Sequence, residues 1–206
     1  LTGHIVLDSG TATGNVNFNS TLTGAFDLDI DAEGSTVAFD ENVTGLADVT
    51  ISAANNVVVG DSTTTDTFTA ASLTQSAGTG TTTVNASVTT AVGGISLTSD
   101  TIAINNLLDT QTNTTGAGVT LNADTNLLTI AAAGDISSDA AVSLTGNTGI
   151  QTAADITTSD AAITLNSATT LTDDIALNSG SGLGNITFSG TIDSDNGGER
   201  NLTVAA

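Results

Sequence analysis

The chain has 206 residues and a formal net charge of −21, with Arg200 as its only lysine or arginine and His4 as its only histidine. Binding to nucleic acid or to an anionic membrane surface needs basic side chains, so both functions are excluded. Proline, cysteine, methionine, tryptophan and tyrosine are absent, which excludes disulfides and leaves few large side chains to fill a wide core.

The opening stretch of the chain recurs near its end. Positions 1–22 align with positions 171–192 without a gap, and ten positions are identical. After a slip of four residues the match continues, with Leu28 opposite Leu202. A sequence that begins and ends in the same phase is expected of a window cut from a tandem array.

The strand pattern is less regular in residues 24–92 than in the rest of the chain. Asp27, Asp29 and Asp31 alternate with apolar residues, which places three carboxylates on one face of a strand. Gly78–Thr83 reads GTGTTT and is expected to form a loop or a widened corner.

Short alternating triplets with apolar outer residues recur along the chain from Val16–Phe18 onward. In each triplet the outer residues share one face and the middle residue faces away. Examples are Val49–Ile51, Ile95–Leu97, Val119–Leu121, Val142–Leu144, Ile163–Leu165 and Ile186–Phe188. Three asparagines each follow such a triplet and are expected to form a polar ladder at a corner: Asn122, Asn166 and Asn178.

The later triplets return at a nearly constant interval, beginning at Val119, Val142, Ile163 and Ile186. A second short strand follows each, aligned on Leu128, Ile150, Leu171 and Ile192, and a third is aligned on Ile136, Ile156 and Ile175. Three short strands in each ~22 residues predict an all-β parallel β-helix of roughly nine coils. An antiparallel sandwich or barrel is the alternative, although its strands would lack a fixed coil period.

Residues 1–206 are therefore predicted to form a single β-solenoid segment. It would consist of one tandem repeat (1–170) and the start of the next (171–206). Matching ends favour copies that join end to end, either in one giant chain or as stacked subunits. No run of 18 apolar residues occurs, so no membrane insertion is expected.

Four segments, Ser72–Asn85, Leu121–Asp124, Ser143–Ile150 and Gly184–Phe188, resemble the repeats of very large bacterial surface proteins. These proteins are described as β-strand-repeat or filamentous-haemagglutinin-like adhesins. The resemblance implies a right-handed parallel β-helix, an extracellular location on the bacterial cell surface, and a role in adhesion, biofilm matrix or a surface filament. Host or surface glycans and proteins are the partners it implies.

Catalysis is not expected, and no catalytic or cofactor-binding residue is assigned. A β-helix enzyme acting on acidic polysaccharides needs clustered acids together with a basic group. His4 and Arg200 lie one near each end of the chain, and His4 is matched by Asp174 in the second copy.

Calcium is the one cofactor that the sequence suggests. Carboxylates of successive coils would lie within ~5 Å of each other, where a cation between them relieves their repulsion. The candidate ligands are Asp27, Asp29, Asp31, Asp40, Glu41, Asp173, Asp174, Asp193 and Asp195.

Ice binding is an alternative function of another class. Flat arrays of threonine on a β-solenoid order water, and the array requires T-x-T rows stacked on one face. T-x-T pairs occur at scattered places: Thr11/Thr13, Thr21/Thr23, Thr65/Thr67 and Thr67/Thr69.

Overall fold

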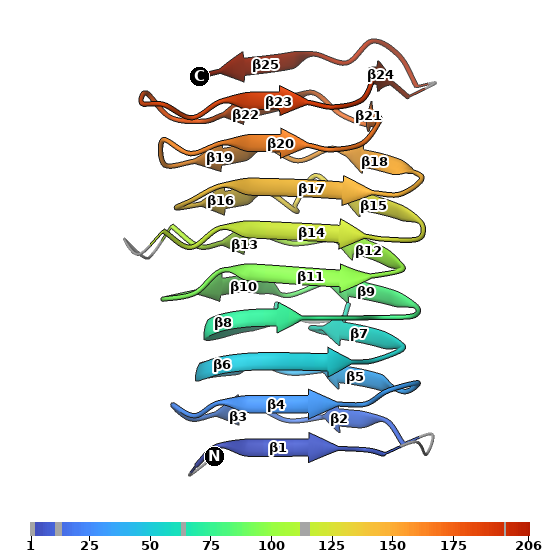
Figure 1. Cartoon of the computed structure of the whole chain (residues 1–206), viewed down its shortest axis with the longest axis vertical. Coiled ribbons are helices and arrows are strands. Elements are labelled where there is room, and N and C mark those ends of the chain that lie inside the picture. Colours follow the sequence, from blue (N-terminus) through green and yellow to red (C-terminus); the bar gives the residue numbers. More distant parts are fainter. Residues whose placement is uncertain (1–2, 11–13, 63–64, 112–115, 196) are drawn as a thin grey trace.

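The chain winds into a column of stacked coils. The computed structural model describes residues 3–10, 14–62, 65–111, 116–195 and 197–206, and in these residues it contains 25 strands and no helix. All strand pairs are parallel, and each strand between the first and last coils bonds to the strand one coil below and one coil above it. The coils rise in a right-handed sense from the first to the last (Figure 1). This confirms the prediction of a right-handed parallel β-helix.

The strands form three sides, named A, B and C in the order in which the chain visits them. Side A contains β1 (Ile5–Asp8), β4 (Leu28–Asp31), the second half of β6 (Val43–Ala53), the second half of β8 (Thr67–Gln75), β11 (Ile95–Ser99), β14 (Val119–Ala123), β17 (Val142–Gly146), β20 (Ile163–Leu165) and β23 (Ile186–Phe188). Side B contains β2 (Val16–Phe18), β5 (Thr36–Phe39), β7 (Asn56–Val59), β9 (Thr81–Val84), β12 (Thr101–Ile104), β15 (Leu127–Ile130), β18 (Gly149–Thr152), β21 (Thr169–Leu171) and β24 (Ile192–Ser194).

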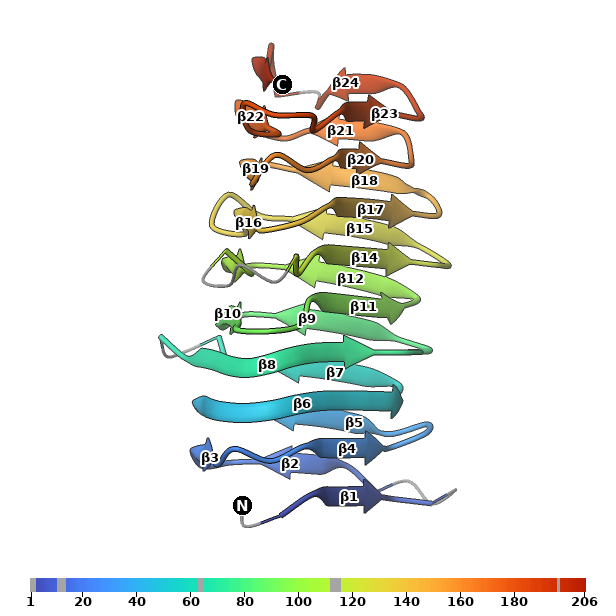
Figure 2. The same cartoon turned by 60° about the vertical axis from the view of Figure 1, so that its left-hand side comes forward.

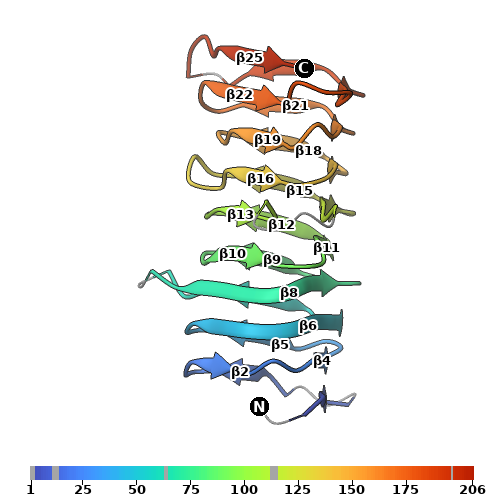
Figure 3. The ribbon, with the colours of Figure 1, turned by 90° about the vertical axis from the view of Figure 1, so that its left-hand side faces the viewer.

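Side C, which faces the viewer in Figure 3, completes the coil. It contains β3 (Leu22–Thr23), the first halves of β6 and β8, β10 (Ser87–Thr90), β13 (Leu108–Asp109), β16 (Ile136–Ser138), β19 (Ile156–Thr158), β22 (Ile175–Asn178) and β25 (Leu202–Ala205). Each side therefore stacks nine strand segments, in agreement with the expected nine coils. The coils differ slightly in length, as the unequal steps Val142↔Ile163 and Ile95↔Val119 on side A show.

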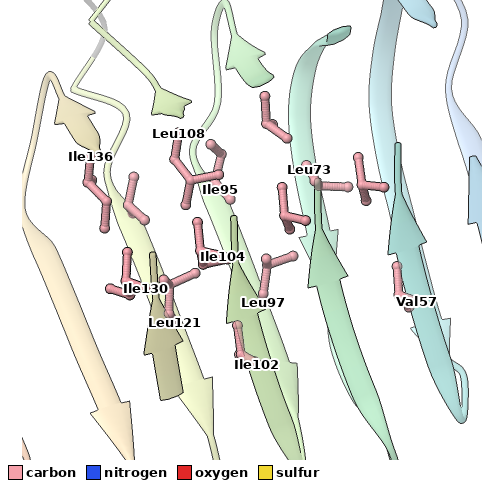
Figure 4. Close-up of a cluster of buried hydrophobic side chains, with 14 of the residues drawn as sticks. Val57, Leu73, Ile95, Leu97, Ile102, Ile104, Leu108, Leu121, Ile130 and Ile136 are labelled. Atoms are coloured by element: carbon pink, nitrogen blue, oxygen red, sulfur yellow. The ribbon is translucent and has the colours of Figure 1, made fainter. Parts of the chain in front are cut away.

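The core is a thin stack of aliphatic side chains between the three sides (Figure 4). Leu121 lies between Leu97 and Leu144 of the neighbouring coils, and all three are at most 1% exposed. Because like residues cover each other from coil to coil, the core needs no large side chains. In the first coils the core also holds aromatic rings: Phe39 stacks on Phe18 at 5.0 Å and meets Phe68 edge-on at 5.4 Å.

Two long strands explain the irregular stretch of sequence. β6 and β8 run from side C to side A without a break (Figure 2), so the corner that separates these sides in later coils is absent. The expected loop at Gly78–Thr83 is wrong for its last three residues, because Thr81–Val84 is strand β9. A polar inward residue is tolerated there since the buried Thr82 hydroxyl donates to Gln75 Oε1 at 2.6 Å.

The strand register differs from the alignment of the sequence in two places. Ile156 pairs with Leu177, not with Ile175, and Ile150 pairs with Thr169, not with Leu171. Both shifts are of two residues, which keeps the same side chains facing inward. The inward pattern in the sequence therefore cannot distinguish the two registers.

The predicted asparagine ladder is also corrected. Asn122 and Asn166 lie on side A two coils apart, with Thr145 between them, and Asn178 lies on side C. The asparagine that does stack on another is Asn105, whose Nδ2 donates to Asn85 Oδ1 at 2.9 Å.

Candidate functional surfaces

Side A carries a continuous column of hydroxyl groups on its outer face. The middle residues of seven successive strand segments are all serine or threonine and lie in register: Thr50, Thr74, Ser96, Thr120, Ser143, Thr164 and Thr187. They face outward because their neighbours along each strand fill the core. Serine or threonine at the middle of successive triplets is the sequence feature from which this column can be identified.

A second outer column runs beside the first. Thr98, Asn122 and Thr145 are in register two residues further along their strands. Asn166 donates through Nδ2 to Ser143 Oγ at 3.0 Å and to Thr145 Oγ1 at 3.2 Å, so it joins the two columns. The result is a lattice of polar groups spaced about 4.8 Å along the axis and about 6.6 Å along each strand.

The hydroxyl columns of side A differ from the T-x-T pairs found in the sequence. Thr11 and Thr13 lie outside the described residues, and Thr67 and Thr69 are on β8 at side C. On side B the corresponding outer column is interrupted by Val58, Ala103 and Gln151. Side A is therefore the more regular surface of the two.

The first group of candidate calcium ligands lies on and directly before β4, one coil below the first hydroxyl of the column. Leu28 and Ile30 are buried, so Asp27, Asp29 and Asp31 point outward as predicted. His4, on the coil below, contacts two of them: Nδ1 is 3.4 Å from Asp27 Oδ2 and Nε2 is 3.2 Å from Asp29 Oδ2. A protonated His4 would therefore reduce the repulsion between these two carboxylates.

The second group lies in the last two coils and is engaged by protein donors. Arg200 holds Asp195 with two contacts, Nε to Oδ1 at 3.1 Å and Nη2 to Oδ2 at 3.3 Å, and this pairing lowers the pKa of Asp195. Asn201 donates to Asp174 from its backbone N at 2.8 Å and its Nδ2 at 2.9 Å, and these bonds lower the pKa of Asp174. Both carboxylates are stabilised in the charged form.

The remaining candidates are dispersed. Asp40 and Glu41 lie at the corner between β5 and β6, while Asp173 and Asp193 each accept a hydrogen bond from the backbone N–H of the next residue. Among the described residues, no three acidic or histidine side chains form a group that could hold a metal ion. Calcium binding therefore stays a prediction from the sequence. The same residues contain no helix long and apolar enough to cross a membrane.

The two end coils leave the core open. Inward residues of these coils are partly buried or exposed, whereas their counterparts in the middle coils are fully buried. The partly buried ones are Ile5, Leu7, Val16, Phe18 and Leu22 at one end and Ile186, Phe188 and Leu202 at the other, and the exposed ones are Ile192 and Val204. In the part of the chain that the structure describes, no further coil lies beyond the first or the last (Figure 1).

The fold and these surfaces define a right-handed three-sided β-solenoid with an ordered polar side. Comparison of the chain with protein-family models, with curated proteins and with solved structures finds no match. What the chain does is therefore inferred from its own surfaces.

Proposed function

We propose that this chain is a length of rigid extracellular solenoid fibre whose copies stack end to end. It would serve as a structural and adhesive stalk or filament on a bacterial surface or in a biofilm matrix. The open core of both end coils supports this proposal most directly. Stacking another coil on either end would cover apolar residues that are only partly buried and would pair the strands at the edge.

The first strand shows how such stacking would be bonded. Ile5 and Ser9 donate their backbone N–H groups to Asp27 and Asp31 of the next coil at 3.0 Å and 2.9 Å. Alternate residues of a parallel strand point to opposite edges. The backbone groups of Val6 and Asp8 therefore point away from the solenoid, where a further coil would bond to them.

The charge of the chain favours growth along the axis over growth sideways. A net charge of −21 on 206 residues makes the lateral surfaces repel one another. The ends instead combine exposed strand edges with apolar area. The adhesin-like repeats of the sequence agree with a surface fibre, whose partners would be host or surface glycans and proteins.

Electron microscopy of the purified chain tests this proposal. We expect unbranched filaments with a ~4.8 Å layer line. Val6→Pro removes one outward-pointing N–H from the edge without touching the bonds to β4, so this variant should fold but not elongate. Val6→Thr keeps the N–H and is the matched control. Discrete particles from the native chain would contradict end-to-end stacking.

The hydroxyl lattice of side A favours a second candidate function, binding to ice. Its columns provide the flat, regularly spaced hydroxyl groups that ordering of water requires, over seven coils in succession. Thermal hysteresis of the purified chain is the test. Thr120→Lys, in the middle of the column, should abolish it, whereas Thr129→Lys, on the interrupted side B, should not. Absence of hysteresis in the native chain would refute this candidate.

A further inference from the structure

The two matching stretches of sequence lie on different sides of the solenoid. β1 belongs to side A and its match β22 to side C, while β2 belongs to side B and its match β23 to side A (Figures 1 and 3). From β1 the chain makes seven complete coils to β20, and then passes two more sides to reach β22. The step from one copy to the next therefore spans seven coils and two thirds of another.

The local structure of the two copies is nevertheless the same. β1 and β22 cover matching residues, and so do β2 and β23. Gly10 and Gly180, at matching positions, both adopt a left-handed φ, of 61° and 88°. Each donates its N–H to a side-chain oxygen two residues earlier: Gly10 to Asp8 Oδ1 at 2.7 Å and Gly180 to Asn178 Oδ1 at 3.0 Å. The matching stretches thus form the same strands and the same glycine turn on different sides.

The contact between one coil and the next also recurs, with the chemical roles exchanged. Ile5 stacks on Leu28 on side A, and their matches Ile175 and Leu202 stack on side C. Beside the first pair, His4 contacts the Asp27 carboxylate. At the corresponding place in the second copy, the carboxylate comes from Asp174 and the donor is Asn201. A contact that persists while donor and acceptor exchange places indicates that both copies use one mode of coil stacking.

The structure also contains the junction between the repeats. The first coil of the second copy packs on the last coil of the first through the pairs Ile156↔Leu177, Ile163↔Ile186 and Thr169↔Ile192. All three sides remain hydrogen-bonded across this junction. The packing of one repeat on the next is therefore continuous with the rest of the solenoid.

We propose that successive repeats of the fibre are related by a rise of about 37 Å and a rotation of one side, about 120°. The partner of each repeat is the next copy of the same repeat. Three repeats would restore the starting orientation after 23 coils, or about 110 Å. This inference rests on the tandem, end-to-end arrangement proposed above.

The rotation has a consequence for the surface of the fibre. A surface that one repeat presents on side A is presented on side C by the second repeat and on side B by the third. The hydroxyl lattice would then face all three directions along the fibre. Such a fibre can contact a partner from any side and at several points at once, which raises avidity.

Cysteine cross-linking in the 206-residue chain tests the rotation, since the native chain has no cysteine. Thr164 and Thr187 are outward-facing neighbours on side A, at a spacing that a disulfide spans. Under oxidation, Thr164→Cys/Thr187→Cys should cross-link in monomeric protein, whereas Thr170→Cys/Thr187→Cys should not. A repeat without rotation would place residue 187 on side B above residue 170 and reverse this result. A reversed pattern, or the absence of both cross-links in folded protein, would overturn the proposal.

The outcome is independent of whether filaments form, because the cross-link is made within one chain. In filaments built from the continuous tandem array, helical symmetry with a rise of about 37 Å but no rotation would overturn the rotation and not the proposed fibre. Separate 206-residue chains stacked end to end would instead repeat every nine coils, about 43 Å. Correct cross-links in a chain that forms no filaments would instead contradict the stacking of separate copies and support the rotation.

Discussion

The two copies of the repeat contain the same leucine in unequal surroundings, which gives a sharp test of the solenoid. Leu177 lies between Ile156 and Val204 and is 1% exposed. Among the described residues, its match Leu7 has Ile30 as its one strand partner and is half-buried. Both are in similar sequence, so local propensity predicts equal effects of substitution and packing predicts unequal ones.

We expect Leu177→Ala to lower the free energy of unfolding by about 3 kcal/mol, within the range for a leucine removed from a closed core. Leu7→Ala should cost about 1 kcal/mol, because the site is covered on one side and its loss leaves no closed cavity. Urea titration followed by circular dichroism measures both, since the chain has no tryptophan or tyrosine for fluorescence. Both variants are compared in dilute, monomeric protein. Equal losses of stability for the two would refute the stacking of the second copy on the first.

Three further predictions concern the acids and one corner glycine. Arg200 lowers the pKa of Asp195, so this pair stabilises the last coil above the ordinary aspartate pKa of about 4 and ceases to do so as the pH falls through the lowered value. In Arg200→Gln the Asp195 pKa, followed by NMR, should return toward its ordinary value; an unchanged pKa would contradict the assigned cause. If the carboxylates bind calcium, adding calcium should raise the melting temperature and EDTA should reverse the change. A melting temperature that neither addition changes would exclude structural calcium. Gly118→Ala places a Cβ 2.5 Å from the Ala141 carbonyl oxygen and should lower the melting temperature by several degrees. Gly34→Ala, where a Cβ meets nothing within 4 Å, should change it little, and similar effects of both would contradict this packing.

Much of the architecture is already determined by the local sequence. Triplets such as Val142–Leu144 alternate apolar and polar residues, which specifies a short strand with one face buried. Their regular return at ~22 residues specifies a coil, and the lack of large side chains specifies a thin core. The outward position of Asp27, Asp29 and Asp31 follows from the same alternation.

Only the tertiary structure decides on which side of the solenoid each strand lies. Coils of unequal length absorb their differences in the corners, and a shift of two residues keeps the same face inward. For this reason Ile156 could be aligned with Ile175 in the sequence although it pairs with Leu177. Nothing local to residues 171–192 specifies side C, because a strand needs only a compatible strand beneath it. The side is the accumulated result of every corner before it, and it places matching sequence on side A in one repeat and on side C in the next.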